Sequence, residues 1–509
     1  MKSTIKISAR KSDLARLQAY MVGDAIKKHF KNTKIEYSFR ESLGDKNLEN
    51  PLWKMPEKGV FTQDFKDDLI QNRTDMVVHS WKDIPIEEND ITAIAGTLAR
   101  ADERDVLLFK NKFLKKGANA GIDALKIFSS SPRREFNLKP FFAWSLPFKP
   151  ATIDFIPVRG NIQTRVLKTL ESDQVHGIIV AKAALDRLLT AKRKEFAPTQ
   201  KFLRKALKEL LVQVIPLSQS PTSAAQGSLA VEINSGNAHI KKVLKKVSAD
   251  LDFKLVNQER TRFKQWGGGC HQKMGVSYKV IGSKNIGLNT LKFERGLDQN
   301  DNFIWNQDVI ESSFQVMNKT IPASSLVEFH ALLEKQILNL KPYKSKKNDA
   351  IIATKSNLLA AGSTQPQYLW TSGMETWKQL AEQGYWVVGS YDSLGEQQRP
   401  EIDVLAGNKP KWKKLTHSQG HSKKWSQTLK LYQVSYSGFE KLAEHKTKTH
   451  FYWSHGDLFL SSIKKFPWLK KKTHICGLGS TLDVLAKHIP KKNIITVYNY
   501  KEWKKKWIM

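Results

Sequence analysis

The 509-residue sequence contains only two cysteines, Cys270 and Cys476, so it cannot form a disulfide framework. It also lacks the marks of an exported or membrane-spanning chain. The first residues, MKSTIKISARKSDLARLQ, carry charges where a signal peptide needs an apolar core, and no apolar run approaches about 18 residues. We therefore expect a cytoplasmic protein with reduced thiols and no membrane span.

Acidic residues are scarce relative to basic ones. Lys and Arg number 83 against 49 Asp and Glu, which gives a formal net charge of +34 and suits a nucleic acid, a membrane surface or a polycarboxylate. The two cations are distributed differently: 15 of the 17 arginines lie at or before Arg262, whereas residues 401–509 hold 22 lysines, seven acids and no arginine. Arginine suits fixed, bidentate recognition of carboxylates, while scattered lysine often only solvates a surface.

The hydrophobic fraction of 40% is sufficient for several globular cores, and we expect about three to four domains. Residues 5–10 and 75–80 have the pattern of strands, and Ser12 suits the N-cap of a helix after the first. Residues 177–185 suit a buried strand that runs into a helix. Alternating strands and helices predict an α/β fold, in which ligands bind beyond the carboxyl ends of strands. Four charged residues fall near such ends: Arg10, Lys82, Asp83 and Lys182.

Seven motifs occur in the order ISARKSDLA, KGVFTQDF, VVHSWKDIP, SSSPRR, RGNIQTR, AAQGSLAVE and ERTRFKQWGGGCHQKMG. In order and spacing they resemble the porphobilinogen deaminase (hydroxymethylbilane synthase) family, over residues 4–280 with a weaker tail to about 340. The resemblance implies two periplasmic-binding-protein-like α/β domains, one of residues 1–100 and 222–248 and one of residues 101–221. It also implies a small α+β domain, residues 249–340, that carries the cofactor.

The family joins four porphobilinogen molecules head to tail on a dipyrromethane primer and releases hydroxymethylbilane for tetrapyrrole (heme) biosynthesis. The resemblance implies that the dipyrromethane is attached covalently to Cys270 through a thioether. A soft thiolate is a suitable nucleophile for an electrophilic pyrrole, and three preceding glycines permit positive φ and close approach. Without the motifs, a lone cysteine would be interpreted as a small buried hydrophobe.

The resemblance makes Asp83 and Lys82 the catalytic pair. A carboxylate beside the pyrrole nitrogens can stabilise the cationic methylene-pyrrole formed when ammonia leaves, and can relay protons. Taken alone, Asp83 in WKDIP is better interpreted as part of a local turn. Trp81 stands where family members commonly have methionine, a change that we expect to alter packing more than chemistry.

Each pyrrole carries an acetate and a propionate, so the implied binding residues are mainly arginines and neutral hydrogen-bond donors. Those expected to bind the cofactor are Cys270, Ser80, Ser129, Ser130, Ser131, Arg133, Arg134, Lys82, Asp83 and Gly227. Those expected to bind substrate are Arg10, Ser12, Arg159, Arg165, Arg187, Gln226 and Lys58. Clustered arginines are costly unless anions neutralise them, so we expect the cofactor to stabilise the fold. For any single arginine, a surface ion pair is the alternative. The family pattern is altered at Phe128, Pro132 and His271.

Lysine-rich residues 341–350 suggest a linker, followed by a C-terminal α/β domain over residues 345–509. HICGLGSTLDVLAKH resembles the closing strand, turn and helix of uroporphyrinogen-III synthase, which would make the chain a fusion protein. Only about 165 residues remain, fewer than that family's usual two domains, so we expect a shortened fold. The candidate contacts there are Ser454, Gly456 and Ser480, although a glycine turn such as 477–480 can simply redirect the chain.

Two other classes of function fit parts of the sequence. A nucleic-acid-binding protein is supported by the net charge and by residues 409–425, which interleave lysine and tryptophan, but no recognised binding motif appears. A non-catalytic solute-binding protein would share the fold. We favour the transferase on motif order, and expect porphobilinogen as the small-molecule substrate, no nucleic acid, no metal and a monomer.

Overall fold

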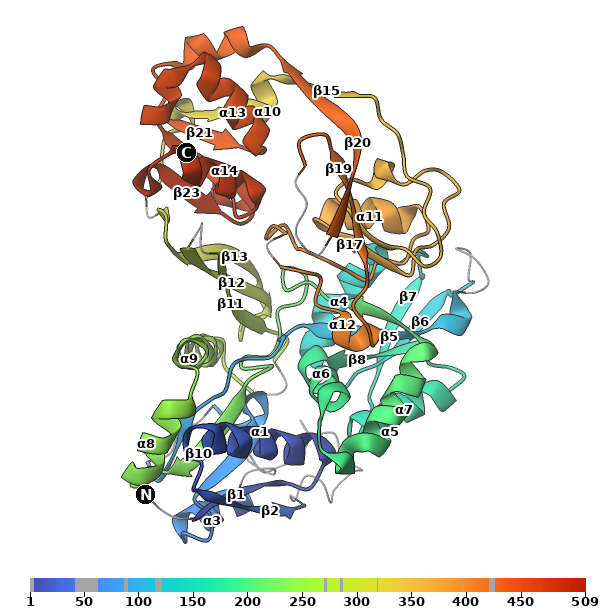
Figure 1. Cartoon of the computed structure of the whole chain (residues 1–509), viewed down its shortest axis with the longest axis vertical. Coiled ribbons are helices and arrows are strands. Elements are labelled where there is room, and N and C mark those ends of the chain that lie inside the picture. The colour runs from blue at the N-terminus through green and yellow to red at the C-terminus, as the bar shows by residue number, and fades with distance from the viewer. Residues whose placement is uncertain are drawn as a thin grey trace. The chain divides into compact units, whose positions relative to one another are not determined.

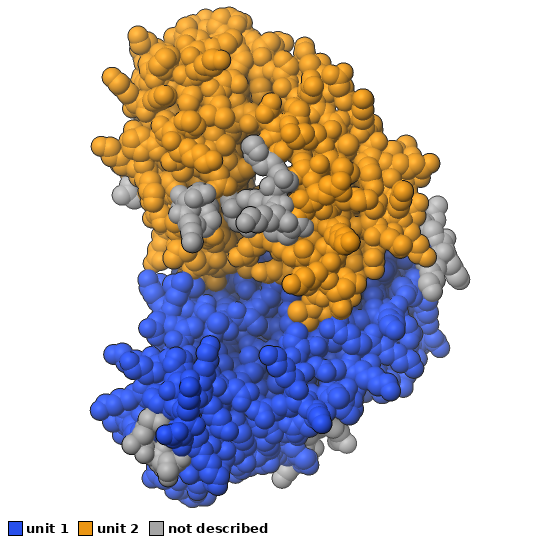
Figure 2. All heavy atoms as spheres, in the orientation of Figure 1, with its two compact units in different colours: residues 1–143, 149–277, 294–304 blue, residues 144–148, 278–293, 305–509 orange. Residues whose placement is uncertain are grey.

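The computed structural model describes residues 4–41, 63–86, 90–114, 121–269, 272–283, 287–317, 319–396, 398–420 and 426–509. The chain divides into two compact units, shown in different colours in Figure 2. Unit 1 comprises residues 1–143, 149–277 and 294–304, and unit 2 comprises residues 144–148, 278–293 and 305–509. Within the described ranges, no helix is long and apolar enough to cross a bilayer.

The first sheet of unit 1 has the strand order β2-β1-β3-β10-β4. Its strands are β1 (Thr4–Arg10), β2 (Lys34–Arg40), β3 (Met76–Ser80), β4 (Thr92–Gly96) and β10 (Leu229–Asn234). Helix α1 (Asp13–His29) lies along this sheet (Figure 1), and Ser12 accepts a hydrogen bond from the Ala15 N–H, which confirms the predicted N-cap. Because β1 and β3 are parallel, the residues after Arg10 and Ser80 leave the same edge of the sheet. Helices α3 (Gln63–Ile70) and α8 (Ala238–Val247) complete this part.

The second sheet of unit 1 has the order β7-β6-β8-β5-β9. Its strands are β5 (Asp105–Lys110), β6 (Ala124–Phe128), β7 (Thr152–Ile156), β8 (Gly177–Ala181) and β9 (Leu210–Val214). Its helices are α4 (Pro132–Ser145), α5 (Ile162–Glu171), α6 (Lys182–Thr190) and α7 (Ala197–Lys208). As in the first sheet, parallel strands are combined with an antiparallel one, here β5. The predicted α/β class is confirmed, with two sheets of mixed strand direction and their helices in unit 1.

The chain crosses between these two sheets twice, through residues 97–104 and 215–228. After the second crossing come α8 and then α9 (Asp250–Gln265), which buries Leu255, Val256 and Glu259. Strands β11 (Gly275–Ser283), β12 (Gly287–Leu297) and β13 (Phe303–Ser312) form a three-stranded sheet whose residues are divided between the two units.

The rest of unit 2 contains two further sheets. The four-stranded sheet is parallel and consists of β14 (Leu326–Glu328), β21 (His450–Trp453), β22 (Thr473–Gly477) and β23 (Ile494–Val497). The six-stranded sheet consists of β15 (Glu334–Leu338), β16 (Ala350–Ala353), β17 (Tyr368–Thr371), β18 (Gly389–Ser390), β19 (Trp412–His417) and β20 (Ser426–Ser437). The helices are α10 (Phe329–Leu332), α11 (Met374–Glu382), α12 (Asp403–Ala406), α13 (Gly456–Lys465), α14 (Ser480–His488) and α15 (Tyr500–Trp507).

The sheets do not divide where the sequence suggested a boundary, near residue 340. Strands β14 and β15 come from inside the expected 249–340 domain, yet they pair with β21 and β20 of the C-terminal region. The expected linker is also integrated, because Tyr343 pairs with Leu359 and the Asp349 carboxylate receives a hydrogen bond from Lys413 Nζ at 2.7 Å. The C-terminal α/β part therefore begins before residue 330 and has room for two sheets. The other domain limits stay a prediction.

Candidate functional site

The segment after β3 holds the predicted catalytic pair in a single 3-10 turn, Trp81–Asp83. The Trp81 side chain is 1% exposed and packs 5.2 Å from the Phe253 ring, while the Trp81 backbone N–H donates to the Ser228 carbonyl at 3.1 Å. These contacts fix the position of the turn that carries Lys82 and Asp83. Asp83 is exposed, and Lys82 is partly buried.

Lys82 is held by an uncharged partner. Its Nζ donates to Gln226 Oε1 at 3.1 Å, and burial lowers the pKa of Lys82 to about 8, with Asp83 opposing and Arg134 reinforcing the shift. A lysine whose charge is this poorly compensated gains most from an added anion. The arrangement can therefore bind a carboxylate beside Asp83.

Gln226 contacts both Lys82 and a buried carboxylate, Asp105, which was not predicted from the sequence. Gln226 Nε2 donates to Asp105 Oδ1 at 2.8 Å, and Arg133 and Arg134 donate to the same carboxylate at 2.9 and 2.7 Å. Asp105 is 0% exposed, and although burial alone would raise its pKa, the two guanidiniums hold that pKa well below its usual range. In the sequence, the only indication of a buried carboxylate here was an acidic residue directly before the apolar run VLLF.

Asp105 supplies part of the negative charge that the clustered arginines need, and the expectation that the cofactor stabilises the fold stays a prediction. Arg133 and Arg134 share the single carboxylate of Asp105, so the fold compensates about one of their two charges, and burial and Arg134 still lower the pKa of Arg133 although Asp105 opposes the shift. Arg165 is different: burial and repulsion from Arg134 lower its pKa to about 10, with Asp83 opposing. Asp83, Lys82, Arg134 and Arg165 are thus close enough to influence one another.

Arg187 and Gly227 meet at the second crossing. An Arg187 guanidinium nitrogen donates to the Gly227 carbonyl at 2.5 Å. Gly227 has φ +90°, and a Cβ there would lie 2.5 Å from the Ala101 carbonyl oxygen, so only glycine fits without movement. Arg10 and Arg159 are partly buried, and both have interaction partners.

The predicted serines all take part in local hydrogen bonds. Ser80 bonds with Gln18 at 3.0 Å, and Ser130 both donates to the Val158 carbonyl and accepts from its N–H. Ser129 accepts from the Ser131 N–H, and Ser131 in turn accepts from the Arg134 N–H at the start of α4. Pro132, a departure from the family pattern, is the first residue of α4, a position that suits proline. A hydroxyl that makes one such bond can still donate or accept another.

The chain matches the family model described as porphobilinogen deaminase, dipyrromethane cofactor binding domain, over residues 5–242. It is 32% identical over 290 residues to porphobilinogen deaminase of Fusobacterium nucleatum subsp. nucleatum, covering 56% of this chain and 86% of the relative. It is 30% identical to that of Dictyostelium discoideum, covering 54% of this chain and 78% of the relative. The chain belongs to the porphobilinogen deaminase family. Among solved structures, the methionine binding protein MetQ covers 50% of this chain and 94% of its own at 10% identity, with a TM-score of 0.29, a similarity too low to support an argument.

Three residues that the porphobilinogen deaminase resemblance singled out, Cys270, His271 and Lys58, lie outside the described residues. The glycines before Cys270 are described, and Gly267, Gly268 and Gly269 have φ of +97°, +60° and +96°. Three consecutive residues in this conformation strongly favour glycine, which fits a loop that must let a bulky group approach its backbone. Among the described residues, no group of three or more His, Cys, Asp or Glu side chains could hold a metal ion.

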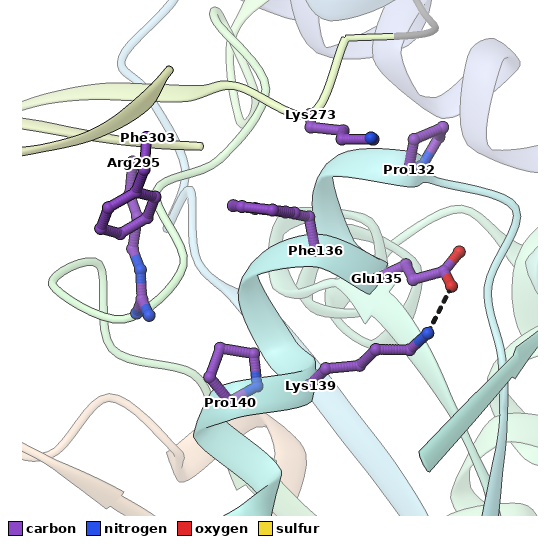
Figure 3. A pocket seen from close by; sticks show the side chains of 8 residues that line it. All are labelled: Pro132, Glu135, Phe136, Lys139, Pro140, Lys273, Arg295 and Phe303. Atoms are coloured by element: carbon purple, nitrogen blue, oxygen red, sulfur yellow. Dashed lines mark hydrogen bonds and ion pairs between the residues drawn. The ribbon is translucent and has the colours of Figure 1, made fainter. Parts of the chain in front are cut away.

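A cavity of about 610 Å³ lies elsewhere on unit 1 of this porphobilinogen deaminase homologue (Figure 3). It is lined by Pro132, Glu135, Phe136, Lys139, Pro140, Lys273, Arg295 and Phe303. Glu135 and Lys139 form an ion pair at 2.7 Å along α4, and Phe136 faces Phe303 with ring centroids 6.2 Å apart. Among the described residues, none of the predicted site residues lines this cavity.

Proposed function

We propose that the chain is an active hydroxymethylbilane synthase that deaminates porphobilinogen and condenses four molecules into hydroxymethylbilane. The observation that carries the proposal is the exposed Asp83 carboxylate beside two incompletely compensated cations, Lys82 and Arg165. This is the arrangement needed to bind a pyrrole through its carboxylates and to stabilise positive charge on its ring.

The residues of unit 1 have different roles in the proposed reaction. Lys82 and Arg165 hold substrate carboxylates, and Asp83 stabilises the cationic methylene-pyrrole that porphobilinogen becomes as ammonia leaves, then takes up the proton released on condensation. Arg10 and Arg159 are further candidates for carboxylate binding. Cys270 would hold the dipyrromethane through a thioether, and the positive-φ glycines before it fit that attachment. When bound, the dipyrromethane supplies the free pyrrole end that is extended.

The decisive experiment is an intact-mass measurement on the purified chain after denaturation. We expect a mass above that of the sequence by two joined pyrrole units, with peptide mapping placing the addition on Cys270. Cys270→Ser should lose the adduct, because a hydroxyl is a far poorer nucleophile than a thiolate near neutral pH. Cys476→Ser is the matched control and should keep it. An unmodified Cys270 in active enzyme would contradict the mechanism.

We also propose that the C-terminal part receives hydroxymethylbilane and closes it to the type III isomer, as in uroporphyrinogen-III synthase. The supporting observation is a basic group in unit 2 formed by Lys335, Lys355 and His455, in which the two lysines carry the charge and the imidazole is neutral near pH 7. Lys335 Nζ lies 3.1 Å from His455 Nε2. Burial and Lys355 lower the pKa of Lys335 to about 8, and burial and Lys335 lower the pKa of His455 to about 4.

Cations that repel one another favour a polyanionic ligand, and hydroxymethylbilane carries an acetate and a propionate on every ring. The group lies beside the residues suggested by the sequence, since the Ser454 hydroxyl bonds with His455 Nδ1 at 2.8 Å and Gly456 opens α13. These contacts support the proposal that Ser454 and Gly456 bind the same ligand, while Ser480 begins α14.

The test for this second activity supplies the full chain with porphobilinogen and analyses the oxidised uroporphyrin isomers. We expect type III to predominate, and Lys335→Gln to shift the product towards type I without slowing porphobilinogen consumption. Lys487→Gln, which changes an exposed lysine of α14, is the matched control. If the wild-type chain yields only type I, the C-terminal part is not an independent synthase.

A further inference from the structure

Arg260 of α9 contacts the turn that carries Asp83. Its guanidinium donates to the Ile84 carbonyl at 3.1 Å and to the Pro85 carbonyl at 2.6 Å. A longer contact of 3.5 Å reaches the Trp81 carbonyl. One planar group therefore contacts the backbone on both sides of Asp83, an arrangement that a lysine ammonium cannot reproduce at several carbonyls at once.

The glycine loop reaches the same turn. A Cβ at Gly268 would lie 3.0 Å from Ile86 Cδ1, so the loop backbone packs directly on the residue that follows Pro85. The loop is itself the continuation of α9, which ends at Gln265. Arg260 and Gly268 thus hold the turn from one helix and from the loop into which that helix leads.

Helix α9 is fixed in unit 1 at the residue before Arg260. Glu259 is 0% exposed, pairs with Arg100 at 2.6 and 3.0 Å, and accepts from the Ala225 N–H at 2.7 Å. The position of Arg260 is therefore set by a buried ion pair and does not depend on an exposed helix surface.

We propose that Arg260 is a positioning residue that fixes the Asp83 carboxylate relative to the glycine loop preceding Cys270. The inference rests on the proposed function, in which Asp83 acts on the substrate and Cys270 holds the primer. A carboxylate in this role must lie within hydrogen-bond reach of the reacting ring, and a misplacement of about 1 Å can cost about a hundredfold in rate. Arg260 acts through the turn and does not need to touch the substrate.

The test measures steady-state kinetics and intact mass for Arg260→Gln and Arg260→Lys. For Arg260→Gln we expect kcat to fall about tenfold to hundredfold, with KM little changed and the primer still attached. Arg260→Lys should fall between Arg260→Gln and wild type. The matched control is Arg262→Gln, which alters an arginine on the same helix whose guanidinium pairs with Glu294; it should keep the wild-type kcat.

A double variant separates positioning from general destabilisation. If Arg260 acts through Asp83, Arg260→Gln should add little loss in an Asp83→Asn background, whereas a merely structural role would give the same loss in both backgrounds. Any one of four outcomes would overturn the inference. Arg260→Gln could keep the wild-type kcat, or Arg262→Gln could lose as much of it. The losses from Arg260→Gln and Asp83→Asn could add up in the double variant, or both Arg260 variants could lose the primer. If instead the proposed function is wrong, the result would differ, because Asp83→Asn would keep full activity.

Discussion

Replacing Asp105 with asparagine tests whether the buried carboxylate is what allows two arginines to lie side by side in unit 1. The substitution preserves shape and removes one charge. Arg133 and Arg134, 3% and 8% exposed, would then face each other without an anion. Removing one partner of a buried ion pair costs about 3 to 5 kcal/mol, and here a single change affects two pairs.

The expected loss is therefore at least about 3 kcal/mol of unfolding free energy. For a region of about 200 residues, 1 kcal/mol corresponds to about 2 to 4 °C, so the melting temperature should fall by about 6 °C or more. The assay is scanning calorimetry at pH 7. Because the folded pKa of Asp105 lies below its unfolded value, its contribution is complete at that pH and is lost only as the pH falls below about 4.

Glu232→Gln is the matched control, since Glu232 is a carboxylate that is 3% exposed and lies in the same unit. Its partners are the Thr92 hydroxyl at 2.6 Å and the His79 ring at 3.1 Å, and neither is an arginine. An amide can keep much of this bonding, so we expect a loss of about 1 kcal/mol. If Asp105→Asn melts no lower than Glu232→Gln, the arginines are not neutralised as described and the reasoning is wrong.

Three other predictions follow from particular residues. Burial lowers the pKa of Lys82 to about 8, so its charge is lost as the pH rises through that value, and kcat/KM should fall over the same pH range. Because arginine does not titrate in this range, Lys82→Arg should remove this alkaline fall from the pH profile of kcat/KM. Gly227→Ala should lower the urea midpoint, because positive φ costs about 1 to 2 kcal/mol and the Cβ would clash with Ala101, whereas Gly121→Ala, at φ +60° with nothing within 4 Å, should cost only the φ term. Burial raises the pKa of the Cys476 thiol, so a thiol reagent should label it only after denaturant is added; labelling of the native protein would contradict the buried position.

The local patterns of unit 1 were readable from the sequence because each element carried a strong signal of its own. Ser12 lies directly before an amphipathic helix, and residues 177–185 combine a continuous apolar run with a helix-forming segment. The boundary near residue 340 was not readable. Strands β14 and β15 are three and five residues long, and only their partners more than 90 residues away determine which sheets they join.

The candidate site was predicted as a set of residue types, and the structure shows why their roles could not be separated beforehand. Arg133 and Arg165 look alike in sequence, yet Arg133 is paired with Asp105 while Arg165 has only the more distant Asp83 opposing its lowered pKa. Arg260 lies in a motif that was noticed for its cysteine, and its contacts to the turn depend on how α9 packs. Such pairings are long-range and leave no periodicity in the sequence.

The distribution of charge can now be interpreted through these partners. Much of the arginine in the first half of the chain is used within the fold, as in the Arg100 pair with Glu259 and the two pairs with Asp105. A high arginine content therefore does not itself indicate an anionic ligand. Burial lowers the pKa of several cations, among them Lys82 and Arg165 in unit 1 and Lys335 in unit 2, but also Arg187 and Lys110. Under the proposed function, carboxylates of porphobilinogen and hydroxymethylbilane would relieve this cost at Lys82 and Arg165 and at Lys335.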